Sequence, residues 1–375
     1  MRTEDRLILL CCKPKLDKKD NKKLNFILQK HLDWNYVWAT SLENRVIIQI
    51  SKHLFKKDIP KEIKENFILY KVRIKKNIEY IKNQFERILP IILKYNEIIL
   101  LRGTAFLYTL YKNRLVRSGG DVDILIDKST KISILHGMIK DHHYVPHEVR
   151  KACPIEFMEY HGNLNRHSYW GMSLANINIK EVWNRSKIIK IKNSSIKVLE
   201  PEDNLIYLSY HNIAKGFIRL YRFLDMIEII ETYNIGWDKV IERSKKYKLS
   251  RSVWMNFYLL NLISKNTVPE GVIKKLEPSK IMKNLILKVF DMGIVLHDPN
   301  PKLKYEYSSV TKNFKKGLLA RLLLVHFNNF YKILLIPLTI FLTENIYQKL
   351  CKIKVIRNSY RRLKACLWNE AYEPG

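Results

Sequence analysis

Residues 98–127 have the sequence IILLRGTAFLYTLYKNRLVRSGGDVDILID, which contains the only tight grouping of catalytic-type residues in the chain. An apolar run at 98–101 is followed by a break at 103–104 and then by residues 105–112, which contain no helix breaker. The end of the segment, 121–126, alternates between polar and apolar residues as a strand does. The pattern predicts a strand, a turn, a helix, a basic loop and a second strand.

The turn after the first apolar run suits an anionic ligand. Gly103 lets the backbone turn tightly, and Thr104 can cap the following helix, whose first amides and positive dipole end would face an anion such as a triphosphate. On the second strand, the side-chain period of two places Asp121 and Asp123 on one face. Divalent cations could bridge these carboxylates to a triphosphate. Arg117, in the loop before that strand, can reach phosphate oxygens.

These residues carry a resemblance to known proteins. The order of apolar strand, small-residue turn, helix and Asp-x-Asp strand is similar to that of the polymerase β-like nucleotidyltransferase superfamily. The chain resembles more narrowly the uncharacterised nucleotidyltransferase family, whose pattern is roughly Lys-Gly-x-Ala, Leu-Tyr, and Arg-x-x-Gly-Asp-hydrophobic-Asp-Leu. The matching positions are Arg102 to Ala105, Leu110, Tyr111, Arg117 and Gly120 to Ile126. Arg102 stands where Lys is commoner, which keeps the charge and changes the donor geometry.

The resemblance implies a fold and an activity. The fold is α/β (α+β), with a small mixed β-sheet forming a polymerase β-like nucleotidyltransferase core and with flanking helical segments. The activity is Mg²⁺-dependent transfer of a nucleoside monophosphate from an NTP, such as ATP, to an acceptor hydroxyl, with release of pyrophosphate and with two Mg²⁺ ions as cofactors. The expected catalytic and metal-binding residues are Asp121, Asp123 and Glu159, and the expected nucleotide-binding residues are Arg102, Gly103, Thr104, Arg117 and Gly120.

The third carboxylate is expected in residues 155–161, which are predicted to form a third strand. Superfamily enzymes place a carboxylate on such a strand, where it can help to hold a metal and can take the proton of the attacking hydroxyl. Glu156 and Glu159 lie on opposite faces because their spacing is odd. The family that the chain resembles has an acidic residue, a hydrophobic residue and then His at this point. That pattern selects Glu159, with His161 beside it on the same face. His161 is either a contact of the acceptor or a structural hydrogen-bonding residue.

The resemblance continues into a helical region that begins near Glu202. Its signature of Asp, Leu and His, followed by Arg and Asp, corresponds to Asp203, Leu208, His211, Arg222 and Asp225. In the superfamily this unit packs over the cleft and helps to seat the nucleotide or the acceptor. We therefore expect His211, Arg222 and Asp225 to act as lid or acceptor contacts. The spacing of Arg222 and Asp225 is also that of an ion pair within one helix.

The length of 375 residues suffices for roughly two or three modest units. The expected parts are an N-terminal helical region (1–94), the nucleotidyltransferase core (95–200), a helical domain covering the cleft (201–330) and a basic, partly apolar helical C-terminal segment (331–375). Asp33 is expected to cap one helix, and residues 63–93 to form another that ends near Pro90. Residues 13–23 are expected to form a charged connector, and 165–200 to form strand and loop.

The charge of the chain bears on its partners. The net charge is +31, from 67 Lys and Arg against 36 Asp and Glu, which favours a partner rich in phosphate. The charge is nevertheless scattered along the chain, and a lysine-rich coding bias would also produce much of it. RNA, a tRNA end among the candidates, is one acceptor, although no known RNA-binding module is recognisable. A small molecule, a sugar or a peptide is the alternative acceptor. A catalytically inactive protein of this fold, acting as a nucleic-acid-binding or interaction module, is the alternative function.

Cysteines and apolar runs indicate the compartment. The five cysteines show no metal-binding pattern and are expected to be reduced, mostly buried thiols. Residues 1–12 are too short and too acidic for a signal peptide, and the longest apolar run, 333–342, is interrupted by Pro337. We expect a cytoplasmic protein without a transmembrane segment. The basic end, 352–364, could lie on an anionic membrane or on RNA, but closing the helical domain is the favoured role.

Overall fold

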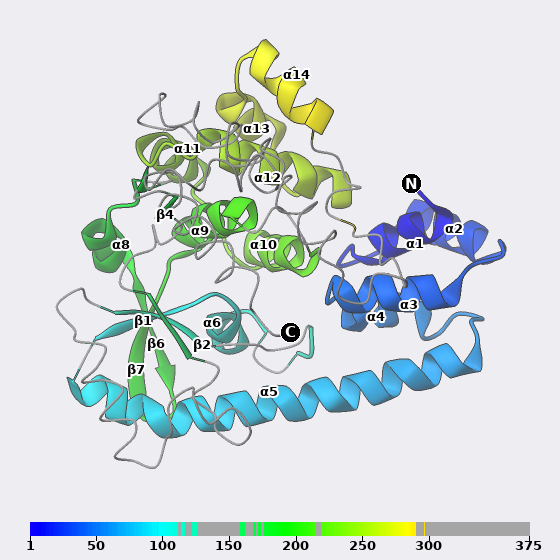
Figure 1. Cartoon of the computed structure of the whole chain (residues 1–375), viewed down its shortest axis with the longest axis horizontal. Coiled ribbons are helices and arrows are strands. Elements are labelled where there is room, and N and C mark those ends of the chain that lie inside the picture. The colour runs from blue at the N-terminus through cyan, green and yellow to red at the C-terminus, as the bar shows by residue number, and fades with distance from the viewer. Residues whose placement is uncertain are drawn as a thin grey trace, which may run out of the picture.

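The computed structural model has a mixed α/β fold, in which helices surround a small β-sheet (Figure 1). It describes residues 1–95, 97–111, 114–116, 122–126, 158–161, 168–169, 172–173, 176–214, 219–289 and 296. The predicted fold class, a small mixed sheet with flanking helical segments, is confirmed. The predicted C-terminal segment, 331–375, and its apolar run lie outside the described residues.

Helices make up the N-terminal part. They are α1 (Thr3–Cys11), α2 (Lys18–Leu28), α3 (Trp34–Glu43), α4 (Ile47–Leu54) and α5 (Lys61–Tyr95). The predicted cap of α3 is confirmed, because the Asp33 carboxylate accepts a hydrogen bond of 3.0 Å from the backbone N–H of Tyr36. The predicted connector at 13–23 is wrong in its second half. There, Asp17 accepts a bond of 2.7 Å from the N–H of Asp20 and starts α2.

Helix α5 is 35 residues long and runs along one side of the molecule (Figure 1). Its predicted end near Pro90 is wrong, since the helix continues to Tyr95 with Pro90 inside it. Pro90 itself is exposed, whereas Leu89 and Ile92 beside it are buried. Packing on the buried face thus outweighs the one hydrogen bond that the proline removes. The same face is buried at intervals of seven residues, at Phe67, Ile74, Ile81 and Ile88.

The central sheet consists of β1 (Ile98–Leu101), β2 (Val122–Ile126), β3 (Met158–His161), β6 (Lys187–Ile191) and β7 (Ser194–Val198). Its order is β3-β2-β1-β7-β6. Strand β1 is antiparallel to β2 and parallel to β7, β2 is parallel to β3, and β6 and β7 form a hairpin. All four residues of β1 are buried, as expected for a central strand. A separate pair, β4 (Ser168–Tyr169) and β5 (Met172–Ser173), is antiparallel.

One helix inside the predicted strand-and-loop region was not expected. Helix α8 (Ile179–Arg185) begins at Asn178, whose side-chain oxygen accepts from the backbone N–H groups of Lys180 and Glu181 at 3.1 and 3.4 Å. The prediction of strand and loop alone for 165–200 is therefore wrong here. A helix of seven residues is too short to show a clear apolar period.

The helices after the sheet are α9 (Pro201–Ala214), α10 (Tyr221–Thr232), α11 (Trp237–Lys246), α12 (Ser250–Ile263), α13 (Glu270–Leu276) and α14 (Lys280–Val289). Helix α9 lies at the centre of this group and contacts α10, α11 and α12. Residues 201–213 are all buried, so α9 is enclosed on every side. Within the part of the chain that the structure describes, no helix is long and apolar enough to cross a membrane.

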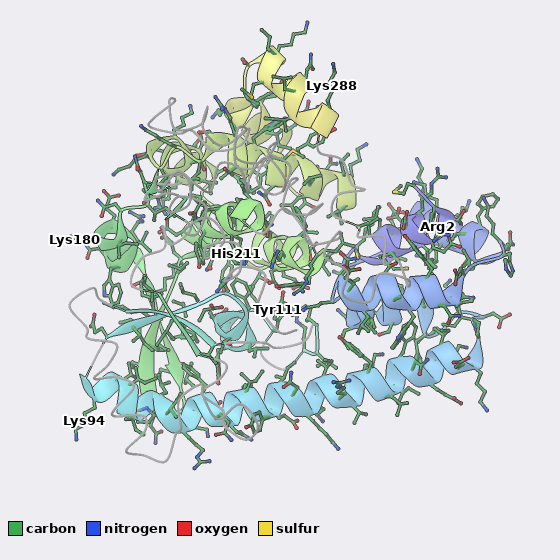
Figure 2. All side chains as sticks on the ribbon, in the orientation of Figure 1. Arg2, Lys94, Tyr111, Lys180, His211 and Lys288 are labelled. Carbon is green, nitrogen blue, oxygen red and sulfur yellow. The ribbon has the colours of Figure 1, made fainter. Side chains whose placement is uncertain are left out.

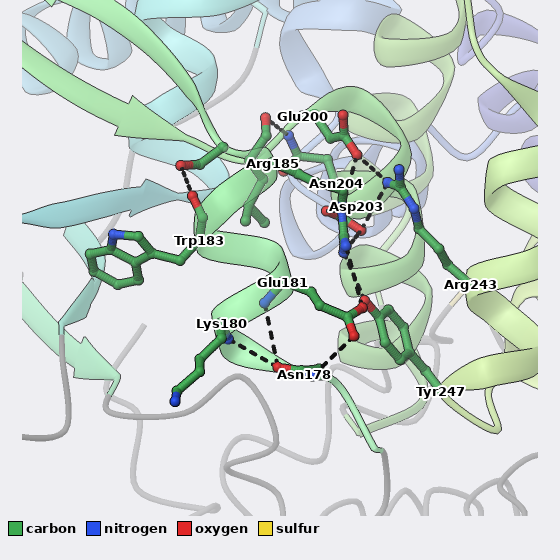
Figure 3. Close-up of polar contacts among 12 residues, drawn as sticks. Asn178, Lys180, Glu181, Trp183, Arg185, Glu200, Asp203, Asn204, Arg243 and Tyr247 are labelled. Carbon is green, nitrogen blue, oxygen red and sulfur yellow. Dashed lines mark hydrogen bonds and ion pairs between the residues drawn. The ribbon is translucent and has the colours of Figure 1, made fainter.

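An ion-pair network fixes the start of α9 (Figure 3). Arg185 of α8 binds Asp203 through Nε and Nη2, at 3.0 and 3.2 Å. Arg243 of α11 binds the same carboxylate at 3.2 Å and also pairs with Glu200. Arg185 further donates to the hydroxyl of Tyr247, at 2.7 Å. Asp203, part of the signature in the sequence, is therefore a structural anchor that joins three helices.

Candidate functional site

The candidate site is built around the junction of β1 and α6 (Arg102–Thr109). Helix α6 begins at Arg102, directly after the last residue of β1, and Arg102 has a left-handed backbone with φ of 46°. The tight turn expected at Gly103 is thus made one residue earlier. Thr104 is the third residue of the helix and is buried, so its predicted role as the helix cap is wrong. The residue before the helix is Leu101, which has no capping side chain.

Strand pairing brings two predicted carboxylate positions together. Asp123 of β2 is opposite Leu101 of β1 and is in register with Glu159 of β3. Asp123 is 3% exposed. For Glu159 and His161 the structure describes the backbone, in which His161 lies two residues beyond Glu159 on β3. Asp121, Arg117 and Gly120 lie outside the described residues.

Arg102 connects the sheet to the helices above it. Its Nη2 forms an ion pair with the Asp123 carboxylate, and its Nη1 lies 3.0 Å from Nε2 and 3.2 Å from Nδ1 of His211. The side chains of Arg102 and Asp123 are 14% and 4% exposed. A guanidinium has only donors, so a ring nitrogen of His211 is the acceptor in this contact. His211 of α9 therefore contacts Arg102 at the junction of β1 and α6.

The far end of α6 is tied to α10. The Tyr111 hydroxyl donates to the Asp225 carboxylate over 2.6 Å, and both side chains are buried. Arg114 pairs with Glu228 at 2.7 Å and donates to the carbonyl of Leu110 at 3.0 Å. Tyr111 and His211 both lie towards the middle of the molecule, where α9 and α10 face α6 (Figure 2). Asp225 thus joins α10 to the segment that follows α6.

Arg222, the third residue expected in the lid, is buried on the same helix as Asp225. Its guanidinium carbon lies 5.5 Å from the centre of the Tyr221 ring. Glu228 was missed by the sequence reasoning. The signal that could have found it is its spacing, because Arg222, Asp225 and Glu228 follow one another at intervals of three residues along one helix face.

Two cations lie near Glu228, because Arg114 pairs with it and Lys52 interacts with its charge. Burial lowers the pKa of Lys52 of α4, the neighbouring charges of Arg114 and Lys71 lower it further, and Glu228 opposes them. Burial also lowers the pKa of Lys71 of α5. Lys52, Lys71 and Arg114 come from three parts of the chain and, with the acid Glu228 beside Lys52 and Arg114, form a basic group of net positive charge after α6. Such a group suits a phosphate-bearing ligand.

The carboxylate positions fit the chemistry of a magnesium site. Mg²⁺ prefers oxygen ligands, and Asp123 with its register partner Glu159 would supply only oxygens. No group of three or more His, Cys, Asp and Glu side chains that could hold a metal is found among the described residues, a set that leaves out Asp121 and the side chain of Glu159. Asp123 and Glu159 are the two positions at which the described backbone brings carboxylic residues together.

Comparison with known proteins identifies the family. A model of the uncharacterised nucleotidyltransferase family matches residues 30–264, more than half of the chain, and this span runs from just before α3 to the end of α12. It includes Arg102, Asp123, His211 and Asp225. Comparisons with curated proteins and with solved structures gave no match. The chain belongs to the uncharacterised nucleotidyltransferase family.

Proposed function

We propose that the chain is a metal-dependent nucleotidyltransferase that moves a nucleoside monophosphate from an NTP to an acceptor hydroxyl and releases pyrophosphate. The observation that carries this proposal is the register of β2 and β3, which makes Asp123 and Glu159 neighbours beside the start of α6. Family membership supports the transferase class.

In the proposed reaction, Asp121, Asp123 and Glu159 would hold Mg²⁺, which when bound neutralises charge on the triphosphate. The first amides of α6 face the phosphates, with Gly103 allowing close approach, and Arg102 and Arg117 donate to phosphate oxygens. Glu159 takes the proton of the acceptor hydroxyl. The acceptor oxygen bonds to the α-phosphorus, the bond from that phosphorus to the bridging oxygen breaks, and pyrophosphate leaves.

The test is Asp123→Asn, which keeps the shape of the side chain and removes its charge. We expect transfer of labelled nucleotide from an NTP to fall by at least about a hundredfold, with an unchanged circular dichroism spectrum. Asp238→Asn is the matched control, because the Asp238 side chain is 93% exposed on α11 and should leave transfer unchanged. Retention of transfer by purified Asp123→Asn would refute the proposal.

The alternative is a catalytically inactive protein of the same fold. The ion pair of Arg102 with Asp123 favours it, since a guanidinium can replace a metal permanently as the partner of that carboxylate. A thermal-shift screen of the four NTPs with and without Mg²⁺ separates the two functions. The enzyme should be stabilised by at least one NTP in a Mg²⁺-dependent manner, and the inactive protein by none.

For the acceptor, we propose RNA. The net charge of +31 and the basic group of Lys52, Lys71 and Arg114 support an acceptor that carries several phosphates. A small molecule, sugar or peptide acceptor would need fewer cations. We also propose a cytoplasmic location, which is supported by the two described cysteines, Cys11 and Cys12, because both are free and buried thiols.

A further inference from the structure

The basic group lies where the N-terminal helices are attached to α10. Asn44, the residue that ends α3, makes this attachment. Its side-chain oxygen accepts a hydrogen bond of 3.0 Å from the N–H of Leu220, and its carbonyl accepts one of 3.3 Å from the N–H of Tyr221, the first residue of α10. Further along α10, Glu228 pairs with Arg114 at 2.7 Å. The cations of α4 and α5 are thus held beside the segment that follows α6.

The cations of this group face solvent, whereas the acid paired with one of them is covered. The side chain of Arg114 is 53% exposed and that of Glu228 is 10% exposed. Lys52 is exposed near the end of α4, and its ammonium donates to the side-chain oxygen of Gln49 at 2.9 Å. Burial and the charge of Glu228 raise the pKa of a second acid, Glu231, although the charge of Arg114 opposes this. The group therefore presents its positive charges outwards.

An exposed aromatic ring lies in the same place. Phe55 is 39% exposed and keeps a helical backbone at the end of α4, with φ of −57° and ψ of −36°. It follows Lys52 by three residues, so the two side chains are neighbours on the helix surface. The ammonium of Lys71 lies 5.1 Å from the centre of the Phe55 ring, and its charge also acts on Lys52. The ring and the cations therefore form one surface.

An aromatic ring among cations suits an unpaired nucleotide. A base of any kind can stack on an aromatic ring, while Lys and Arg contact the phosphates on either side of it. In a duplex the faces of the bases are already stacked on one another, so a surface ring has no face to stack on. An anionic membrane would also attract the cations, but the apolar residues of α4 itself are all buried, and Phe55 alone is a small apolar surface for lipid.

We propose that Phe55, Lys52, Lys71 and Arg114 bind an unpaired segment of the acceptor RNA, with one base stacked on Phe55 and phosphates on the three cations. This inference rests on the proposed function, because it takes the acceptor to be RNA, and it specifies the form in which that RNA is bound. The surface makes two separable contributions to affinity. The phosphate contacts weaken with salt, whereas the stacked base adds affinity that depends on the ring.

The experiment compares two probes that carry equal numbers of phosphates, an oligouridine and an abasic chain, each of about eight units. Fluorescence anisotropy measures their binding, and circular dichroism checks that each variant is folded. We expect the unchanged chain to bind oligouridine at least about fivefold tighter than the abasic chain. Phe55→Leu should abolish this preference without changing the salt dependence of the abasic chain. Phe55→Trp should keep or increase the preference, which decides the case if Phe55→Leu does not fold.

Two controls separate the ring from the charges. Phe26→Leu is the matched control, because Phe26 of α2 is 62% exposed and has the ammonium of Lys30 4.8 Å from its ring centre, but lies outside the basic group. It should leave the preference for oligouridine unchanged. Arg114→Gln should make the salt slope shallower by about 0.7 and also leave the preference unchanged.

Equal affinity of the unchanged chain for the two probes overturns the proposal, as do equal losses in Phe55→Leu and Phe26→Leu. Phe55-dependent binding to phosphatidylserine vesicles without a preference for oligouridine also overturns it and indicates a membrane surface. The proposed function fails separately. Nucleotide transfer to a small acceptor without a preference for oligouridine removes this site alone, whereas a Phe55-dependent preference without any nucleotide transfer removes the proposed activity alone.

Discussion

At the scale of single residues, the site depends on how the buried negative charge of Asp123 is compensated. Asp123 is almost inaccessible to water, and its partner Arg102 takes a left-handed backbone with φ of 46°. That conformation costs an arginine about 1–2 kcal/mol. Strain of this kind is retained where the surrounding structure requires it, and functional sites are frequent examples. Here the left-handed residue directs the chain from β1 into α6 and brings the guanidinium onto Asp123.

The contact between Tyr111 and Asp225 gives a residue-scale prediction. Tyr111→Phe removes a buried donor and leaves one bond of the Asp225 carboxylate unmade, which should lower the free energy of unfolding by about 1–3 kcal/mol. Urea denaturation followed by circular dichroism measures this change. Tyr80→Phe is the control, since Tyr80 is 42% exposed on α5 and should be nearly neutral. If Tyr111→Phe is as nearly neutral as Tyr80→Phe, the hydroxyl of Tyr111 contributes no stability.

The sequence indicated Asp123 and Arg102 as candidate site residues because a strand with period two and a small-residue turn are local patterns. It could not predict that Arg102 would contact His211, since 109 residues separate them and the contact depends on how α9 packs over the sheet. Thr104 was misplaced for a local reason. A glycine was expected to make the turn, but an arginine with positive φ made it and moved the start of the helix forward.

At the scale of elements, α5 shows how packing overrides local propensity. The sequence marked Pro90 as an end of the helix, because proline lacks an N–H and crowds the preceding turn. The buried residues on both sides of Pro90 continue the apolar period across it, and the helix follows them. Helix α8 shows a different limit of sequence reasoning. Its seven residues are too few to show an apolar period, and its start is marked only by the Asn178 cap.

Pro90→Ala gives an element-scale prediction. Alanine restores the missing N–H and the helix propensity, while the greater freedom of the unfolded chain offsets part of the gain. We expect the free energy of unfolding to rise by about 1–3 kcal/mol, measured by urea denaturation. Asn83→Ala, at another exposed position of α5, should add only about 0.5 kcal/mol. A loss of stability in Pro90→Ala would show that the fold requires a bend at this position.

At the scale of the whole molecule, charge is the property that the sequence establishes most directly. The net charge of +31 belongs to the chain as a whole, whereas the basic group of Lys52, Lys71 and Arg114 exists only because α4, α5 and the segment after α6 meet. Composition could therefore indicate a phosphate-rich partner, but it could not locate a surface for one. The packing of these elements provides a place to test.

RNA binding gives a prediction at this scale. We expect the logarithm of the association constant for single-stranded RNA to fall linearly with the logarithm of salt concentration, with a slope steeper than about −3. Replacing Lys52, Lys71 or Arg114 by Gln should make the slope shallower by about 0.7 per lost phosphate contact. Fluorescence anisotropy over a salt series measures it. Lys274→Gln, with a side chain 72% exposed on α13, should leave the slope unchanged, and a flat response of the unchanged chain would exclude RNA.

The length of α5 has a mechanical consequence. Its 35 residues extend over about 50 Å, and β1 starts three residues after it ends. A tilt of about one degree at the distal end would displace the other end by about 0.9 Å, more than the roughly 0.5 Å tolerance of a catalytic constellation. Glu86 opposes such a lever motion, because it holds the near half of α5 to Tyr108 of α6, at 3.1 Å, and to Lys192 of the β6–β7 hairpin, at 2.7 Å. A partner that binds the distal half of α5 would therefore load these two contacts before it could shift β1.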